Sequence, residues 1–310
     1  MENNVLMDVS VLIVNWNVRD LLASCLDSLY GEQHPFSFEV IVVDNASTDG
    51  SVDMLRQRFP QARVIENRVN NGFAPGNLQA YALSSGRYIL MLNPDICLHP
   101  GALDQLYGFM EKHPQAAGVG PDLRNPDGSR QVGCYPFPTL SREAWRLFHL
   151  DRLRAYGTYP VMQWDSKTTR AVDVIQGACL LLRHQALEEV GFLDADYYMY
   201  TEEVDLCYRL KKAAWQIYWL PSSQVVHFGG QSTHQAAEAM FLKLYESKTL
   251  FFRKQYGPVS ARIYKLILYL AAIYRIGFSP LLWLLKPGER PETKILVSNY
   301  RRLLSAIPAY

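Results

Sequence analysis

Short apolar runs alternate with amphipathic segments along the first third of the chain. Four runs rich in Val, Ile and Leu predict strands, because unbroken apolar stretches of this length are typical of sheets covered on both faces. They span residues 9–14, 38–43, 63–66 and 88–92. Between them, apolar positions recur with helical spacing and predict helices over about residues 21–29, 51–59 and 75–84. The alternation predicts an α/β fold, Rossmann-like, with a mostly parallel central sheet flanked by helices.

The rest of the chain carries weaker patterns. Helices are predicted at residues 101–113, 184–190 and 202–213, and strands at residues 172–182, 216–220 and 225–226. The 172–182 strand contains Gly177 and Ala178, and glycine weakens a strand unless something must approach its backbone closely. Residues 125–128 (Asn-Pro-Asp-Gly) are a strong turn signal and predict a hairpin. Residues 139–170 have weak periodicity, which favours a mobile or substrate-facing insert.

Polar side chains follow three of the predicted strands. Asn15, Asp44 and Asn93 each come directly after an apolar run. Right-handed crossovers place the loops that follow parallel strands along one rim of a sheet, and open α/β folds bind ligands there. We therefore expect these three loops to share one crevice.

Candidate metal ligands stand near the same rim. Asp95 follows Pro94, and a carboxylate in that position can hold a divalent cation that also contacts phosphates. A simple turn is the alternative interpretation of this segment. His227 follows a short apolar run and precedes two glycines, and its imidazole suits Mn²⁺ better than Mg²⁺.

A second acidic cluster, Glu202, Glu203 and Asp205, begins a predicted helix. Glu202 and Asp205 share a helix face, and Asp205 can pair with Arg209 four residues later. Glu203 is then the candidate for a general base, which must reach a substrate hydroxyl and be ionised at neutral pH. The alternative is a solvated helix start, where carboxylates are favourable for electrostatic reasons alone.

Two loops have the composition of a nucleotide site. Asp44 can accept hydrogen bonds from a base or ribose, although residues 47–49 after it would also cap a helix. Residues 70–77 mix amides and glycines at a helix start, where backbone N–H groups can meet a diphosphate. On its own the second signal is weak, because Asn-Gly loops are common turns.

Composition narrows the class of protein. The chain has 310 residues, 49% of them hydrophobic and 20% charged, which is ordinary for a globular protein. A net charge of +1 without a basic stripe argues against a nucleic-acid partner. Five scattered cysteines without a CxxC pair favour a reducing compartment and argue against structural zinc. The polar, acidic N-terminus does not predict a signal peptide.

The C-terminal third is more apolar. Residues 263–285 are mostly apolar and aromatic, but Lys265, Arg275 and Pro280 interrupt them, so a clean membrane-spanning helix is not expected. The pattern favours a pair of short helices, surface-lying or re-entrant, with basic side chains toward phospholipid head groups. These are Lys254, Arg262, Lys265, Arg275 and Lys286. The alternative is an amphipathic helix that caps the core.

Seven motifs, in this order along the chain, resemble those of the family-2 inverting glycosyltransferases of GT-A fold, and most closely their bacterial rhamnosyltransferase-like branch. The motifs are VLIVNWN (11–17), VVDNASTDGS (42–51), NGFA (71–74), LNPD (92–95), GA (177–178), YTEEVDL (200–206) with Arg209, and HFGGQS (227–232). The resemblance implies a GT-A domain over residues 1–235, with a nucleotide-sugar-binding half at 9–115 and an acceptor and catalytic half at 116–235. Residues 236–310 would form a helical, membrane-associating extension.

The resemblance also implies roles for single residues. The nucleotide contacts would be Asn15, Asp44, Asn45, Asn71, Gly72 and Asn93. Asp95 and His227 would hold Mg²⁺ or Mn²⁺ on the diphosphate. Glu203 would be the base, with Glu202 and Asp205 as alternatives. Asn93 stands where many relatives have Asp, which removes one possible metal ligand.

The implied activity is transfer of a sugar, with inversion, from a nucleotide diphosphate to a hydroxyl of a lipid-linked or growing bacterial surface polysaccharide. The first expectation for the donor is dTDP-L-rhamnose, and the alternative is a UDP-hexose or UDP-galactofuranose. A non-catalytic nucleotide-sugar-binding scaffold is a rival. A nucleotidyltransferase is disfavoured, because no Gly-rich loop with Arg or Lys follows the first strand. The expected partners are the donor, a glycan or polyprenyl-linked acceptor, and a membrane surface. The expected location is cytoplasmic, peripheral on the inner face of the bacterial plasma membrane.

Overall fold

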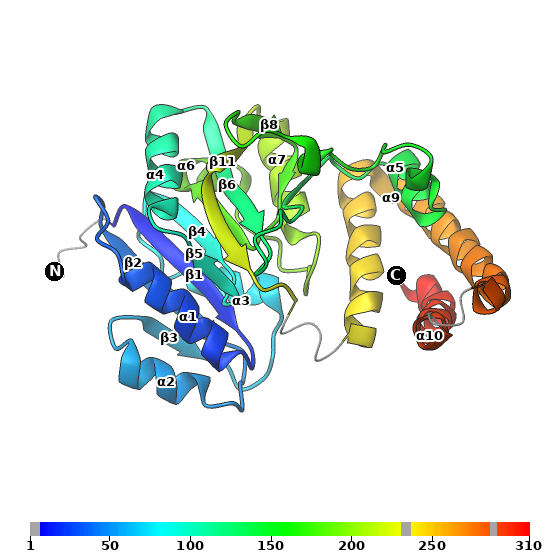
Figure 1. Cartoon of the computed structure of the whole chain (residues 1–310), viewed down its shortest axis with the longest axis horizontal. Coiled ribbons are helices and arrows are strands. Elements are labelled where there is room, and N and C mark those ends of the chain that lie inside the picture. Colours follow the sequence, from blue (N-terminus) through cyan, green and yellow to red (C-terminus); the bar gives the residue numbers. More distant parts are fainter. Residues whose placement is uncertain (1–6, 231–236, 286–289) are drawn as a thin grey trace. The chain divides into compact units, whose positions relative to one another are not determined.

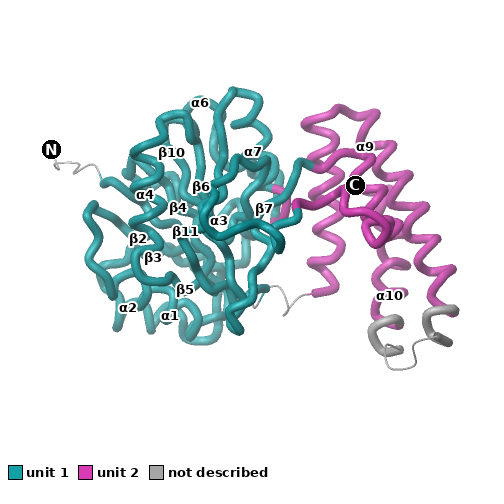
Figure 2. The backbone as a smooth tube through the Cα atoms, turned by 45° about the horizontal axis from the view of Figure 1, so that its top comes forward, with its two compact units in different colours: residues 1–137, 160–198, 202–235 teal, residues 138–159, 199–201, 236–310 magenta. Residues whose placement is uncertain are grey.

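The computed structural model describes residues 7–230, 237–285 and 290–310. The chain divides into two compact units (Figure 2). The first comprises residues 1–137, 160–198 and 202–235, and the second comprises residues 138–159, 199–201 and 236–310. Residues 138–159 and 199–201 therefore cluster with the C-terminal helices, whereas the sequence places them in the first domain. Gln231, Ser232 and Lys286 lie outside the described residues.

The first unit is built on one large sheet with helices packed on it (Figure 1). Its first four strands are β1 (Val9–Asn15), β2 (Phe38–Asp44), β3 (Arg63–Glu66) and β4 (Tyr88–Leu92). They pair in parallel in the order β3-β2-β1-β4. The connecting helices are α1 (Arg19–Tyr30), α2 (Ser51–Arg58) and α3 (Phe73–Tyr81). The predicted α/β fold class, these strands and the intervening helices are confirmed.

The other half of the sheet is mixed rather than parallel. After β4 the order continues with β10 (Cys179–Arg183), β6 (Ala116–Arg124), β11 (Gln216–His227) and β5 (Ile96–Leu98), and β8 (Arg170–Val172) pairs with β11. β10 runs antiparallel to both neighbours, and β5 and β8 run antiparallel to β11. β6 and β11 pair in parallel. The expectation of a mostly parallel sheet thus holds for the N-terminal half. The other half contains antiparallel pairs, because strands that return without a crossover connection pair antiparallel.

Several strands differ from their sequence patterns. β6 is not predicted, since glycines and an aspartate interrupt its apolar run. Its Gly120 makes room for a neighbour, because a Cβ there would lie 2.3 Å from Cγ2 of Ile175. The predicted 172–182 strand is divided: β9 (Val174–Ile175) pairs with β7 (Cys134–Tyr135), and β10 joins the main sheet. The last two predicted strands are one strand, β11, with a register shift between Leu220 and Gln224.

Helices α4 (Ala102–Lys112), α6 (His184–Val190) and α7 (Glu202–Lys212) lie where helices are predicted.

The alternation of side chains along β1 shows how the sheet is covered on both faces. Val11 and Ile13 belong to the core cluster formed with α1 and α4. Val14 points to the opposite face, where a Cβ at Gly76 of α3 would lie 2.9 Å from its Cγ1.

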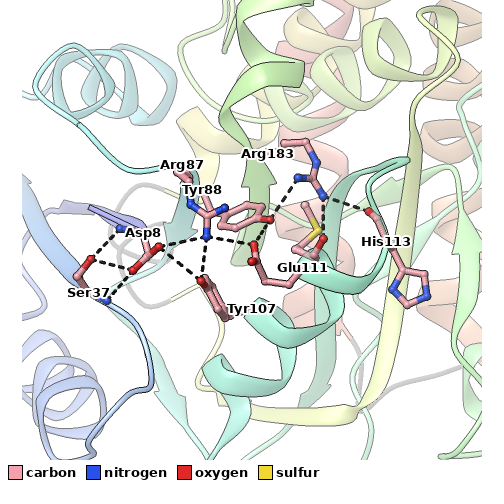
Figure 3. A network of polar contacts seen from close by, with 9 residues as sticks. Asp8, Ser37, Arg87, Tyr88, Tyr107, Glu111, His113 and Arg183 are labelled. Carbon is pink, nitrogen blue, oxygen red and sulfur yellow. Dashed lines mark hydrogen bonds and ion pairs between the residues drawn. The ribbon is translucent and has the colours of Figure 1, made fainter. Parts of the chain in front are cut away.

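A polar network lies at the amino-terminal edge of the parallel strands (Figure 3). Arg87, directly before β4, contacts Asp8 Oδ1 at 3.1 Å and Glu111 Oε1 at 3.2 Å through Nη2. The same nitrogen donates to the hydroxyl oxygen of Tyr107 at 2.9 Å. Exposed pairs of this kind contribute about 0–1 kcal/mol each. Arg87, Asp8 and Glu111 are thus paired with one another at this edge, and the predicted nucleotide and metal residues lie at the opposite ends of the strands.

The second unit is helical. Its helices are α5 (Leu140–Leu147), α9 (Ala237–Leu285) and α10 (Arg290–Ala306). Tyr264, Leu268 and Tyr300 are buried in its core. α9 consists of two helical segments that meet at Gly257, whose φ of +87° is not helical. Residues 139–170, predicted to be a mobile or substrate-facing insert, contain α5 and the short helices η1 (Leu150–Arg152) and η2 (Val161–Gln163).

The C-terminal region corrects the prediction of two short helices over residues 263–285. The segment after Gly257 continues to Leu285 as one helix. Pro280 has no N–H for the carbonyl of Ile276, and the hydroxyl of Ser279 donates to that oxygen at 2.7 Å instead. Arg275 does not face lipid, because it donates to the backbone oxygen of Leu147 at 3.0 Å. None of the described helices combines the length and unbroken apolar sequence needed to cross a bilayer.

Candidate active site

The ends of β1 and β2 are joined by a buried pair of side chains. Asn15 and Asp44 are register partners, and Nδ2 of Asn15 donates to Oδ2 of Asp44 at 2.8 Å. Oδ1 of Asp44 accepts the N–H of Ser47 at 2.8 Å, which closes the loop after β2. Both side chains are buried. These bonds hold the loop in place, and they leave Oδ1 of Asn15 as a buried acceptor without a partner in the described part of the chain.

The loop before α3 is held against the same region. Nδ2 of Asn45 donates to the backbone oxygen of Gly72 at 3.0 Å. Gly72 adopts a φ of +95°, and a Cβ there would lie 2.4 Å from the backbone oxygen of Tyr198, so only glycine fits. The N–H of Phe73 donates to that oxygen at 2.8 Å. The structure thus brings Asn45 and Gly72 together, with Asn71 partly exposed beside them.

Asp95 and His227 meet where β5 pairs with β11. Ile96 and His227 are register partners, and the N–H of Phe228 donates to the backbone oxygen of Asp95 at 3.0 Å. Oδ1 of Asp95 lies 3.4 Å from Nε2 of His227, and the two residues are 6% and 5% exposed. Nδ1 of His227 lies 2.6 Å from Oε1 of Gln131. An amide oxygen only accepts hydrogen bonds, so Nδ1 carries the hydrogen of the neutral ring and Nε2 has a lone pair.

This pair fits a divalent cation. Oδ1 of Asp95 and Nε2 of His227 are both buried acceptors without a hydrogen-bond partner among the described residues. Adjacent ligands of one ion, each at about 2.1 Å from it, lie roughly 3 Å apart, which is close to the separation seen here. Across the described ranges no group of three His, Cys, Asp or Glu residues is placed to hold a metal ion. Oδ1 of Asn93, at the end of β4, is another buried acceptor without a partner in this described set.

The first turn of α7 carries two carboxyl groups in different environments. Glu202 is buried, and this burial, followed by the charge of Glu203, raises the pKa of Glu202 well above its ordinary value. Glu203 is less buried than Glu202, so its charged form loses less solvation. Tyr200 and Thr201, directly before the helix, have φ values of +68° and +72°. Such strained backbone is concentrated at functional sites.

Asp205 is engaged in a structural brace. Its Oδ2 accepts Nε–H of Arg209 at 2.7 Å, and its Oδ1 accepts the hydroxyl of Tyr197 at 3.3 Å. Arg209 also donates to the backbone oxygens of residues 190–192. The pairing with Arg209 that the sequence allows is therefore present, and it occupies Asp205 in holding the segment after α6.

Glu203 lies beside the break between β9 and β10. A Cβ at Gly177 would lie 3.6 Å from Cβ of Glu203 and 3.4 Å from Cε of Met91. The oxygen of the next residue, Ala178, accepts the N–H of Asn93 at 2.8 Å. The start of α7 therefore lies close to Gly177 and to the end of β4, after which Asp95 follows, and a Cβ at Gly177 would make only ordinary van der Waals contacts there.

Sequence reasoning does not identify Gln131. It stands shortly after the predicted 125–128 turn and reaches His227, a residue 96 positions further along the chain. A single glutamine has no motif of its own, and its contact with His227 depends on how the hairpin folds back. The turn signal was the available clue, because it predicts that residues after 128 return alongside β6.

Comparisons with known proteins agree with this fold and with the predicted family. The sequence model described as Glycosyl transferase family 2 matches residues 10–191. N-acetylglucosaminyl-diphospho-decaprenol L-rhamnosyltransferase of Mycobacterium tuberculosis (strain CDC 1551 / Oshkosh) is 29% identical over 70% of this chain and 75% of that protein. Rhamnosyltransferase WbbL of Escherichia coli (strain K12) is 24% identical over 71% of this chain and 83% of that protein. The solved structure of mannosyltransferase PcManGT from Pyrobaculum calidifontis, in complex with GDP-Man and Mn²⁺, superposes with a TM-score of 0.55. It is 15% identical and covers 99% of this chain and 89% of that one, which shows a shared fold.

Proposed function

This chain belongs to glycosyl transferase family 2, and from that premise we propose that it is a metal-dependent, inverting glycosyltransferase. The observation that carries the proposal is the pair of buried acceptors, Oδ1 of Asp95 and Nε2 of His227, 3.4 Å apart at the ends of the strands. Two acceptors at this distance repel each other unless a cation or a proton lies between them. Family membership supports the transferase class, and this pair supports metal dependence.

Asp95 and His227 are the residues that would hold Mg²⁺ or Mn²⁺ against the donor diphosphate. The ion, when bound, offsets the negative charge that develops on the leaving phosphate. The proposed nucleotide contacts are Asn15, Asp44, Asn45, Asn71, Gly72 and Asn93. The unpartnered amide oxygens of Asn15 and Asn93 support this set, because a bound ligand can supply the donors that they lack within the described chain.

Glu203 is the proposed base. It removes the proton of the acceptor hydroxyl, and the acceptor oxygen forms its bond to the anomeric carbon as the bond to the diphosphate oxygen breaks. Attack opposite the leaving group inverts the configuration. The partly exposed position of Glu203 supports this assignment, because its neighbour Glu202 is buried and has a raised pKa. Asp205 remains in its pair with Arg209.

The proposed donor is dTDP-L-rhamnose, with a UDP-hexose or UDP-galactofuranose as the alternative, and the proposed acceptor is lipid-linked or a growing polysaccharide. Support comes from two similar proteins that are rhamnosyltransferases, one of which is named for an N-acetylglucosaminyl-diphospho-decaprenol acceptor.

We also propose that the protein works in the cytoplasm, peripheral on the inner face of the plasma membrane. The support is the outer face of α9 beyond Gly257. Apolar residues recur there at helical spacing and are 42–62% exposed, namely Val259, Ile263, Leu266, Leu270 and Ile273. The opposite face, with Tyr264 and Leu268, is buried in the second unit. A helix that is apolar on its exposed face as well, with the exposed Arg262 at the border, is suited to lie in a lipid surface.

A panel of nucleotide sugars tests the enzymatic proposal. The protein is incubated with each donor and Mn²⁺, with and without a polyprenyl-linked acceptor, and both nucleotide release and thermal stability are measured. We expect release to be highest with dTDP-L-rhamnose, to be abolished by a chelator, and to depend less on Mn²⁺ in His227→Ala. If nucleotide release is highest with another donor, the sugar of that donor replaces the proposed one. Stabilisation without release from any donor would favour the non-catalytic scaffold.

A further inference from the structure

A chain of hydrogen bonds runs from an exposed turn to the ring of His227. The hydroxyl of Ser129 donates to Oδ1 of Asp127 at 2.6 Å, and Nδ2 of Asn125 donates to Oγ of Ser129 at 2.8 Å. Nε2 of Gln131 donates to Oδ1 of Asn125 at 2.9 Å. Oε1 of Gln131 then faces Nδ1 of His227 at 2.6 Å. All five side chains belong to the first unit.

The donor-to-acceptor direction of this series of hydrogen bonds is set at its exposed end. Hydrogen bonds from Ser129 lower the pKa of Asp127, so its side chain is a carboxylate that only accepts. Ser129 has one hydroxyl hydrogen, which it gives to Asp127, and it must accept from Asn125. The amide of Asn125 therefore presents its oxygen to Gln131, and the amide of Gln131 presents its oxygen to His227.

We propose that Gln131, oriented by this series of hydrogen bonds, fixes His227 in the tautomer with hydrogen on Nδ1, so that Nε2 presents its lone pair toward Asp95. Gln131 is a positioning residue and acts through His227. The inference rests on the proposed function, in which Asp95 and His227 hold the metal. Histidine ligands of metals commonly donate their other ring N–H to a fixed acceptor, which sets the tautomer and the ring orientation.

The opposite tautomer is disfavoured by the same contacts. A lone pair on Nδ1 would face the oxygen of Gln131 and be repelled by it. To remove this repulsion, the side-chain amides of Gln131 and Asn125 would both have to turn over, and Ser129 would have to give up its hydrogen bond to Asp127. The backbone holds the network as well, because the N–H of Gln131 donates to the oxygen of Leu123 at 2.8 Å. Without an acceptor at Nδ1, hydrogen on Nε2 can bond to Asp95 and the lone pair needed by a metal is lost.

Two substitutions of Gln131 test the proposal. Gln131→Met removes the acceptor at nearly constant length, and Gln131→Glu keeps an oxygen for Nδ1–H. The ring ¹⁵N shifts of His227 are measured in metal-free protein across a pH series and are assigned by comparison with His227→Ala, and the tautomer is taken from the shifts at the high-pH plateau. We expect hydrogen on Nδ1 in the unsubstituted protein and in Gln131→Glu, and on Nε2 in Gln131→Met. Mn²⁺ affinity, measured by electron paramagnetic resonance, should fall about 10–100-fold in Gln131→Met alone.

Gln79→Met is the matched control. Gln79 exchanges amide hydrogen bonds with Asn67 at 2.8 Å and 3.1 Å, and its loss should leave the tautomer and the Mn²⁺ affinity unchanged. Hydrogen on Nε2 in the metal-free unsubstituted protein, or equal Mn²⁺ affinity in Gln131→Met, would overturn the proposal. An unsubstituted protein that binds no Mn²⁺ but keeps hydrogen on Nδ1 would refute the metal site of the proposed function and support the tautomer assignment.

Discussion

Glu202 and Glu203 are neighbours in the first turn of α7, but burial affects them differently. Glu203→Gln removes the proposed base and keeps the shape of the side chain. We expect turnover to fall by at least about 100-fold, the usual size of a general-base contribution, while donor affinity stays nearly constant. Steady-state kinetics and donor titration measure the two effects. Glu188→Gln, at an exposed position of α6, is the control. Near-normal turnover in Glu203→Gln would reject the assignment.

Glu202 should make the stability of the protein depend on pH. Its pKa in the folded state is raised above the ordinary value of 4.5, so the folded state holds this proton more tightly than the unfolded state. The resulting stabilisation is complete below the unfolded pKa and is lost as pH rises through the folded pKa. Glu202→Gln stays neutral, so we expect it to melt at a higher temperature than the unsubstituted protein at about pH 8. The two melting temperatures should converge near pH 4.5, and parallel curves over this range would contradict the assignment.

At the level of elements, the entry to α3 depends on one backbone conformation. Gly72 has φ +95° and ψ 179°, a region that is essentially restricted to glycine. Gly72→Ala should destabilise the protein by roughly 1–3 kcal/mol through backbone strain, with a further loss from the clash with Tyr198. Denaturant unfolding measures the change. Gly101→Ala is the control, because Gly101 also has positive φ but its Cβ would have 4.0 Å of clearance to Gln105. Equal losses in the two variants would show that neither the glycine-only backbone region of Gly72 nor the clash with Tyr198 adds to the cost of ordinary positive φ.

The start of α7 is held by contacts with neighbouring segments. The Asp205–Arg209 pair holds the segment after α6, Ala178 accepts the N–H of Asn93, and a Cβ at Gly177 would lie in ordinary van der Waals contact with Glu203. These contacts bring Glu203 beside the end of β4. The acidic cluster is thus divided by its surroundings into a brace, a buried carboxyl group and a proposed base.

For the molecule as a whole, the exposed apolar face of α9 predicts binding to lipid. Leu266→Glu combined with Leu270→Glu places two charges on that face at positions 57% and 49% exposed, so the fold should be retained. Burying one leucine is worth about 1.5–3 kcal/mol, so we expect sedimentation with anionic liposomes to weaken at least 10-fold. Met162→Glu, at a site 61% exposed in the first unit, should bind as the unsubstituted protein does. Undiminished sedimentation of the double variant would count against the membrane proposal.

Local patterns were sufficient for much of the fold. The first four strands and the helices between them were predictable, because burial on both faces of a strand and on one face of a helix repeats along the sequence. β6 was not, because Gly118, Gly120 and Asp122 interrupt its apolar run. Its place between β10 and β11 depends on partners that lie far from it in the chain. The sequence pattern predicted that Arg275 faces lipid head groups. Its hydrogen bond to Leu147 was not predictable for a similar reason, because the two residues are 128 positions apart.

The candidate site shows the same difference between local patterns and distant contacts. Motifs were enough to select Asp44, Asp95, Glu203 and His227 as candidates, because loops after strands and polar residues beside apolar runs can be recognised in the sequence. Folding alone brought Asp95 within 3.4 Å of His227, occupied Asp205 with Arg209, and placed Gln131 against the imidazole. A local pattern encodes whether a residue is buried and in what conformation. Which hydrogen-bond partner it meets depends on contacts between distant segments, and those contacts set the charge, the tautomer and the orientation of each side chain.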